Sequence, residues 1–545
     1  MPPTVLGASA AQLRIARAKV WLSERVAGEP VLVVAATVDA ANDLLRNAAS
    51  EQGACFGWYR FTLGQLADRL ATPALCKQNL APIGLLAAEA VAARVVFAMA
   101  RAGELGRYAA VGEGPGFSRA VARALAELRL ARVDATKLGA APSELRALFD
   151  AYEIELRRAE LVDRARVFTL AAEAARDRKS RDPLIELPTL LLDVPIENAA
   201  ERDLVEAIAR RSPDLLITIP AGDSATRTQL KAISGLKFEA VDMEGGSLEN
   251  LQRHLFEEAA PAEQLLDPSV LVLSAPGENR ECVEIARRIL RLARDGVAFD
   301  RMAVLLRSPE EYRPHLEAAL GRAGIPAHFA RGAVRPDPAG RAFAALLTCA
   351  AEGLSARAFA EYLSLGEVPD ADVQGGPPAA PPAADRTGVP DEELVPGAVA
   401  QALAEASDPT DEAAQTEDPD AVPVTAGTLR APRRWEGLLV DAAVIGGRER
   451  WVRRLDGLER ELRLDLEEVK DPGDPTAERL NRDLAHLSSL RIYAMPLIDA
   501  LATFPEQATW GEWLDTLSSL ATRALRDPVR VLATLAELAP MAEIG

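Results

Sequence analysis

The sequence predicts an α/β protein in which two parallel-sheet domains carry large helical insertions. Short, largely apolar segments at Val31–Ala36, Leu187–Asp193 and Leu215–Pro220 are typical of strands that are buried on both faces. Segments with apolar residues at helical spacing, such as Ala40–Glu51 and Ala199–Arg211, follow such strands. This alternation of strands and helices predicts a parallel sheet that is covered by helices.

The first α/β domain is expected over residues 1–260. A short strand at Thr4–Gly7 precedes a helix at Ala10–Ala27, and Arg60–Leu70 is interpreted as a short strand that turns into a helix. Residues 83–180 are rich in Ala, Leu and Arg, which favour helix. These residues therefore predict a helical insertion in the first domain.

A second α/β domain is expected to begin at residue 268 and to extend to residue 366. Apolar runs at Val270–Ser274 and Met302–Leu306 predict its first two strands. Between them, apolar residues recur at helical spacing from Cys282 to Leu292, and residues 333–366 continue as helix. The predicted order is strand, long helix, strand and helix.

The remaining chain is expected to form a linker and a helical domain. Residues 367–430 are rich in Pro and Ala and hold fourteen acidic residues against two arginines. Such a segment buries too little apolar surface to offset its ordering entropy, so we expect disorder there. Residues 431–545 return to amphipathic helices, with Trp435, Leu438 and Trp451 at helical spacing.

Composition limits the class of protein. A length of 545 residues allows several domains, and no apolar run is long enough to cross a membrane. We therefore expect a cytoplasmic protein that does not contact a membrane. The four cysteines are far apart and include no CxxC pair, which favours free buried thiols over a zinc or disulfide framework. The net charge of −19 opposes nucleic-acid binding, but residues 367–430 hold most of it.

The segment Val270–Gly332 carries a resemblance to a known family. Glu281 and Glu284 lie on the helix after its first strand, its second strand runs Asp300–Arg307, and Gly324-Ile325-Pro326 follows the next helix. This arrangement resembles the second motor domain of UvrD/Rep-type (superfamily 1) helicases. The similarity is to the degenerate form found in AddB-like subunits of helicase–nuclease complexes, which belong to the PD-(D/E)XK nuclease family.

The resemblance covers roughly residues 1–366 and implies two helicase-like domains of the P-loop NTPase type. In the family, a helical insertion interrupts the second motor domain, and residues 431–545 resemble an incomplete copy of it. A nuclease domain follows in the family. We therefore expect this chain to be the N-terminal portion of a longer protein or the product of a split gene.

A helicase motor needs a phosphate loop of the form GxxxxGK[ST], because its N–H groups, lysine and hydroxyl act together on phosphates and Mg²⁺. The matching positions here run from Gly7 through Ser9 to Arg14, and only the first glycine is present. Arg14 and Lys19 offer charge, but neither is on the loop itself. Gly7 and Ser9 are thus candidates for a degenerate nucleotide site, and the alternative is a turn kept only for the fold.

Two further residues belong to this degenerate site by resemblance. Asp193 ends an apolar strand, as does the aspartate that holds Mg²⁺ in active relatives, but Val194 replaces the glutamate that activates water. Arg307 matches the arginine that closes over the phosphates. A strand-end aspartate is also common as a helix cap, and a strand-end arginine as a solvated charge. No cofactor is assigned to this chain, although active relatives use ATP and Mg²⁺.

Candidates for DNA contact lie at the Trp58-Tyr59 pair and at Arg60. Motor relatives contact single strands near this position, and aromatic rings stack on bases. Packing of the aromatic pair in the core is the alternative. We assign no catalytic and no metal-binding residue, because Glu468-Val469-Lys470, which fits the E-x-K nuclease motif, ends a charged helical run.

Three functions remain open at this point. The first is a catalytically inactive, motor-like scaffold that binds DNA (a single strand or a duplex end) or docks an AddA-like helicase–nuclease subunit during double-strand-break repair and recombination. The second is an active ATP-dependent DNA helicase subunit. The third is a protein-interaction module with no role on DNA, which the acidic charge favours.

Overall fold

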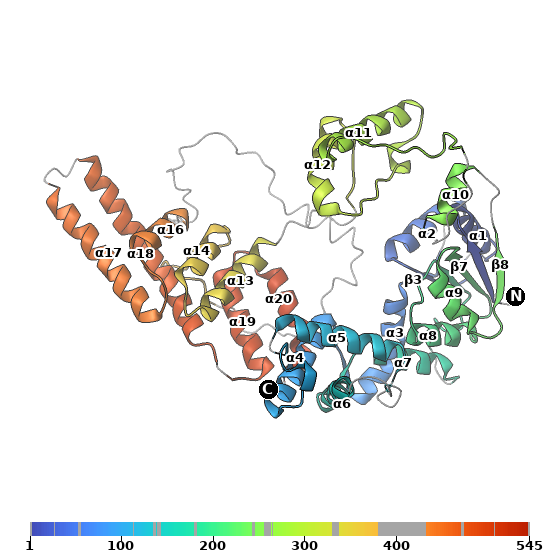
Figure 1. Cartoon of the computed structure of the whole chain (residues 1–545), viewed down its shortest axis with the longest axis horizontal. Coiled ribbons are helices and arrows are strands. Elements are labelled where there is room, and N and C mark those ends of the chain that lie inside the picture. The colour runs from blue at the N-terminus through green and yellow to red at the C-terminus, as the bar shows by residue number, and fades with distance from the viewer. Residues whose placement is uncertain are drawn as a thin grey trace. The chain divides into compact units, whose positions relative to one another are not determined.

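The computed structural model consists of two compact units (Figure 1). It describes residues 3–379 and 432–542, apart from residues 27, 53–55, 113, 134–137, 139–142, 179–181, 242–245, 256–262, 264, 330–336, 470–473 and 506. The first unit comprises Met1–Gln78, Glu127–Val133 and Ala165–Val334. The second comprises Asn79–Ala126, Asp134–Arg164 and Arg335–Gly545.

A six-stranded parallel sheet organises the first unit. Its strands are β1 (Thr4–Ala8), β2 (Val31–Ala35), β3 (Trp58–Phe61), β6 (Thr189–Leu192), β7 (Leu215–Pro220) and β8 (Lys237–Ala240). Their order is β3-β2-β6-β7-β1-β8, and every pair of neighbours is parallel. The predicted α/β class with a parallel sheet is thus confirmed.

Burial follows the position of each strand in the sheet. Every residue of β2 and β6 is buried, whereas β3 and β8 at the two edges are largely exposed. Val33, Leu190 and Leu216 from three adjacent strands form one core cluster with Trp21 and Leu22. The continuous apolar runs in the sequence therefore mark strands that helices cover on both faces.

Helices follow the strands and cover the sheet. They are α1 (Ala11–Ser23), α2 (Val38–Gln52), α3 (Leu63–Gln78), α7 (Arg164–Arg176), α8 (Ala199–Ala209), α9 (Ser224–Lys231) and α10 (Ser247–His254). The chain moves from β1 to β2 to β3 in one direction across the sheet, and from β6 to β7 to β8 in the other. Because parallel crossovers are right-handed, α1 and α2 cover one face, and α8 and α9 cover the other.

The last part of the first unit is a helical pair, α11 (Glu278–Arg294) and α12 (Pro309–Arg322). Cys282 and Ala286 of α11 pack against Leu316 and Leu320 of α12. Leu306 and Phe329 lie against the same cluster. The two predicted helices of this segment are therefore present.

The second parallel sheet predicted over residues 268–366 is not found in the part of the chain that the structure describes. Val270–Ser274 and Met302–Leu306 form no strand there. Val272 is 80% exposed and Leu305 is 95% exposed. A strand is held by hydrogen bonds to a neighbouring strand, and neither segment has such a neighbour among the described residues.

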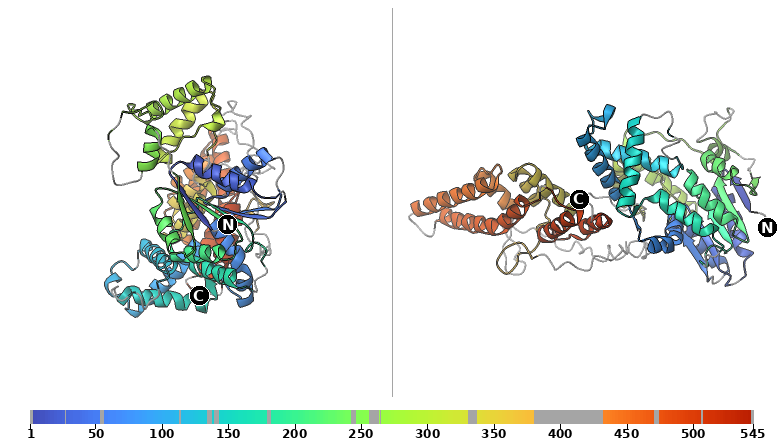
Figure 2. Two further views of the ribbon diagram at one scale, coloured as in Figure 1. Left: turned by 90° about the vertical axis from the view of Figure 1, so that its right-hand side faces the viewer. Right: turned by 90° about the horizontal axis from the view of Figure 1, so that it is seen from below.

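The second unit is almost entirely helical. Its helices are α4 (Leu85–Ala102), α5 (Pro115–Leu130, which continues into the first unit), α6 (Ser143–Arg158), α13 (Pro338–Ala351), α14 (Ala356–Ser364), α16 (Pro432–Asp441), α17 (Arg448–Glu468), α18 (Pro475–Ala502), α19 (Trp510–Ala524) and α20 (Val529–Ala536). Two short strands, β4 (Ala81–Pro82) and β5 (Leu161–Val162), pair in parallel. The long helices α17 and α18 lie side by side, as Figures 1 and 2 show.

This grouping differs from the predicted domain boundaries. Helices α4 and α6, predicted as an insertion of the first domain, belong to the same unit as residues 335–545. Of the predicted disordered segment, residues 380–430 lie outside the described residues. Its beginning is ordered, since Val368 is 3% exposed and the N–H of Arg526 donates to the carbonyl of Glu367 at 2.8 Å.

Aromatic side chains form the centre of the helical unit. Trp435 stacks on Tyr493 with ring centroids 5.5 Å apart, and Phe359 meets Trp451 edge to face at 5.3 Å. The hydroxyl of Tyr362 donates to the carbonyl of Ala524 at 2.6 Å and lies 2.5 Å from the hydroxyl of Tyr493. These bonds join α14, α18 and α19 inside an apolar core, where unpaired polar atoms are costly.

The cysteines agree only in part with the prediction of buried thiols. Cys282 and Cys349 are buried and free, and burial raises the pKa of the Cys349 thiol to about 12. Cys76 is exposed, and Cys55 lies outside the described residues. Among the helices that the structure describes, none has both the length and the apolar composition needed to cross a lipid bilayer.

The tyrosine pair leads to a stability prediction. We expect Tyr362→Phe to lower the free energy of unfolding by about 1–3 kcal/mol, because the buried carbonyl of Ala524 loses its donor. Tyr493→Phe should cost less, because Tyr362 still donates to that carbonyl. Urea unfolding followed by tryptophan fluorescence measures both variants. Equal losses would contradict the assigned direction of the hydrogen bonds.

Candidate functional site

The carboxyl edge of the sheet is the region where a nucleotide site was predicted. Ligands of open parallel sheets bind beyond the carboxyl ends of the strands, where the strand order reverses. Strand β1 extends to Ala8, so Gly7 lies inside the strand and not on the loop. A Cβ atom on Gly7 would meet its nearest neighbour, the carbonyl of Glu239, at an ordinary 3.8 Å. The geometry therefore does not require glycine at this position.

Arg14 dominates the loop between β1 and α1. It lies in the first turn of α1, yet it is only 6% exposed. Its Nη1 donates to the carbonyl of Ala8 at 2.5 Å and to the carbonyl of Ser9 at 3.1 Å. A phosphate loop turns N–H groups toward an anion. This loop turns carbonyl oxygens toward a cation, so its polarity is the opposite.

Asp193 completes the network from the end of β6. Both of its carboxylate oxygens accept from Nε of Arg14, at 2.9 and 3.0 Å. The hydroxyl of Thr218 on β7 donates to the same carboxylate at 2.8 Å, and the N–H of Asp193 donates back to the carbonyl of Thr218 at 3.1 Å. Asp193 has a φ of 49°, a left-handed conformation that Asp tolerates better than most residues. The carboxylate of Asp193 thus already accepts hydrogen bonds from two side chains, Arg14 and Thr218.

The position after Asp193 offers no group to activate water. Val194 is 3% exposed and contributes to the apolar core. The next loop is held by the N–H of Ile196, which donates to the hydroxyl of Thr226 at 2.9 Å. Asn198 is the N-cap residue of α8, and its side chain accepts from the N–H of Glu201. The described polar groups between β6 and α8 therefore make hydrogen bonds to neighbouring parts of the fold.

Helix α1 is fixed at its other end as well. Arg25 pairs with Asp214, which immediately precedes β7, and its guanidinium lies 4.1 Å from the ring centroid of Trp21. The indole N–H of Trp21 donates to the same carboxylate at 3.1 Å. Two aspartates in the loops around β6 and β7 therefore hold the two ends of α1.

The structure unites some of the predicted nucleotide residues but not all of them. Ser9 and Asp193 meet through Arg14. Arg307 is exposed, and within the described residues no hydrogen bond or ion pair joins it to that network. Of the two family glutamates, Glu281 accepts from the hydroxyl of Tyr312 at 3.0 Å. Glu284 pairs within its own helix with Arg280 and Arg287.

The predicted DNA residues lie on the edge strand β3. Trp58 is half-buried and packs against the sheet core, as the core alternative proposed. Tyr59 is 43% exposed, and Arg60 is exposed. Successive strand residues point to opposite faces. Tyr59 and Arg60 therefore point to opposite faces of the sheet.

Sequence reasoning noted the charge of Arg14 but missed its role. A usable signal exists, because Ala10, Arg14, Ala18 and Leu22 recur at intervals of four, and all four are buried. A charged residue in the apolar stripe of a helix needs a partner from the rest of the fold. Nothing in the sequence indicated that the partner is Asp193 or that the hydroxyl of Thr218 donates to the same carboxylate.

Comparison with known proteins adds no assignment. No model of a known protein family matches the chain, and no curated protein shows a significant match to it. Within the described residues, no three His, Cys, Asp or Glu side chains gather closely enough to hold a metal ion. The resemblance to AddB-like proteins therefore stays a prediction.

Removal of the Arg14 side chain tests the network. We expect Arg14→Ala to lower the free energy of unfolding of the first unit by about 1–3 kcal/mol, because Asp193 and the carbonyls of Ala8 and Ser9 each lose one donor. The side chain of Asp193 is 26% exposed, which keeps the cost below that of a fully buried pair. Hydrogen–deuterium exchange of the peptide that covers α1 provides the measurement.

Arg46→Ala is the matched control. Arg46 forms a surface pair with Asp43, and their side chains are 77% and 70% exposed. Its loss should change stability by no more than about 0.5 kcal/mol. If the two variants exchange at the same rate in α1, the network does not hold the helix.

Proposed function

We propose that this chain is an ATP-independent, helicase-like scaffold of an AddB-type helicase–nuclease that acts in double-strand-break repair and recombination. In this role it binds DNA at a single strand or a duplex end, or docks an AddA-like active subunit. The nuclease chemistry belongs to a part of the system outside these residues. The proposal assigns no catalytic residue to this chain.

The sheet supports the motor-like part of the proposal. Strand β1 with its following loop and helix, and the end of β6 two strands away, meet at the carboxyl edge. This is the place where parallel α/β proteins bind phosphates and nucleotides. The resemblance implies a parallel sheet of this kind for the first domain. The DNA and AddA-like partners rest on that resemblance alone.

The observation that carries the proposal is the position of Arg14. Its guanidinium donates to the carbonyls of Ala8 and Ser9 at the β1–α1 connection and pairs with the strand-end Asp193. In an active motor, the phosphates and Mg²⁺ connect the corresponding loop and aspartate. Here a side chain connects them, which favours a nucleotide-independent unit over the alternative of an ATP-dependent helicase subunit.

The second alternative is a protein-interaction module with no role on DNA. Its support is the net charge of −19, which opposes binding to a polyanion. Residues 367–430 hold fourteen of the acidic residues, so the rest of the chain is closer to neutral. A measured DNA affinity and its dependence on salt separate this alternative from the proposal.

Fluorescence anisotropy of a forked, end-labelled duplex provides the test. We expect binding that weakens as salt rises, because phosphate contacts release counterions. ATP with Mg²⁺ should leave the dissociation constant unchanged, because the β1–α1 connection turns the carbonyls of Ala8 and Ser9 toward Arg14. Absence of binding at low salt would refute direct DNA recognition. ATP turnover would instead favour the helicase alternative.

Variants on the edge strand locate the contact. If Tyr59 stacks on a base, Tyr59→Ala should weaken binding by about 1–3 kcal/mol with little change in the salt dependence. If Arg60 contacts a phosphate, Arg60→Ala should lower the salt slope by about one. Arg46→Ala, an exposed arginine on α2 of the same unit, should change neither quantity. Equal affinities for all variants would exclude β3 from the DNA contact.

A further inference from the structure

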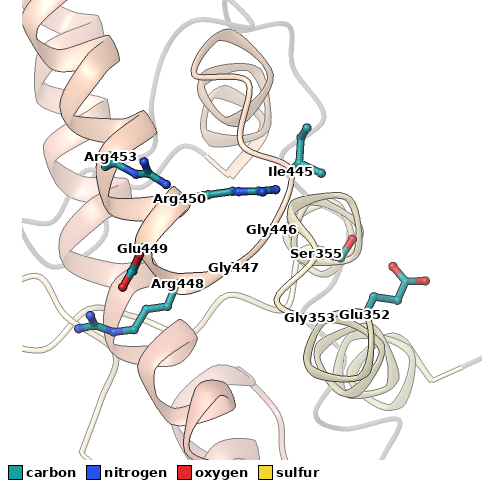
Figure 3. A pocket seen from close by; sticks show the side chains of 10 residues that line it. All are labelled: Glu352, Gly353, Ser355, Ile445, Gly446, Gly447, Arg448, Glu449, Arg450 and Arg453. Carbon is teal, nitrogen blue, oxygen red and sulfur yellow. The ribbon is translucent and has the colours of Figure 1, made fainter.

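We draw no further inference here: the strongest candidate, the pocket between the α13–α14 and α16–α17 loops of the helical unit (Figure 3), rests on two helix N-termini and two exposed arginines, and no second observation in the described part of the chain points to a ligand there.

Discussion

The ion pair between Arg14 and Asp193 is the constraint on which the α/β unit depends. It lies where the β1–α1 loop, the end of β6 and the hydroxyl of Thr218 meet, and it fixes the start of α1 above the sheet. At the other end of α1, Asp214 binds both Arg25 and Trp21. A helix that is held at both ends by loops of the central strands cannot shift without breaking charge-assisted bonds. Ion pairs with the loops of β6 and β7 therefore tie both ends of α1 to the sheet.

The central strands were predictable because strands that are buried on both faces consist of continuous apolar residues. The apolar run predicted at Val31–Ala36 is the strand Val31–Ala35, and the run at Leu215–Pro220 matches its strand. Edge strands lack this signal. Strand β8, Lys237–Ala240, was not predicted, because an exposed strand of four residues with alternating polar positions looks like a loop.

Other features depend on partners that a local pattern does not show. The runs at Val270–Ser274 and Met302–Leu306 have strand composition, but a strand also needs a neighbour, and periodicity says nothing about one. The sequence places Arg14 in an apolar stripe, but for the same reason it does not show what Arg14 pairs with. Its partner Asp193 is 179 residues away in the sequence. Side-chain networks of this kind are decided by packing of distant segments, which composition and spacing do not encode.

The division of the chain into units has a consequence for its synthesis. The helical unit combines residues 79–126 and 134–164 with residues 335–545, so its first helices leave the ribosome well before the helices they join. At ordinary rates of translation, the intervening residues of the other unit take roughly 10–30 s to make. During that time α4 and α6 can pack on each other, as they do in the finished unit, while residues 335–545 have not yet been made. Folding of the whole unit is therefore completed only after residues 335–545 have been made.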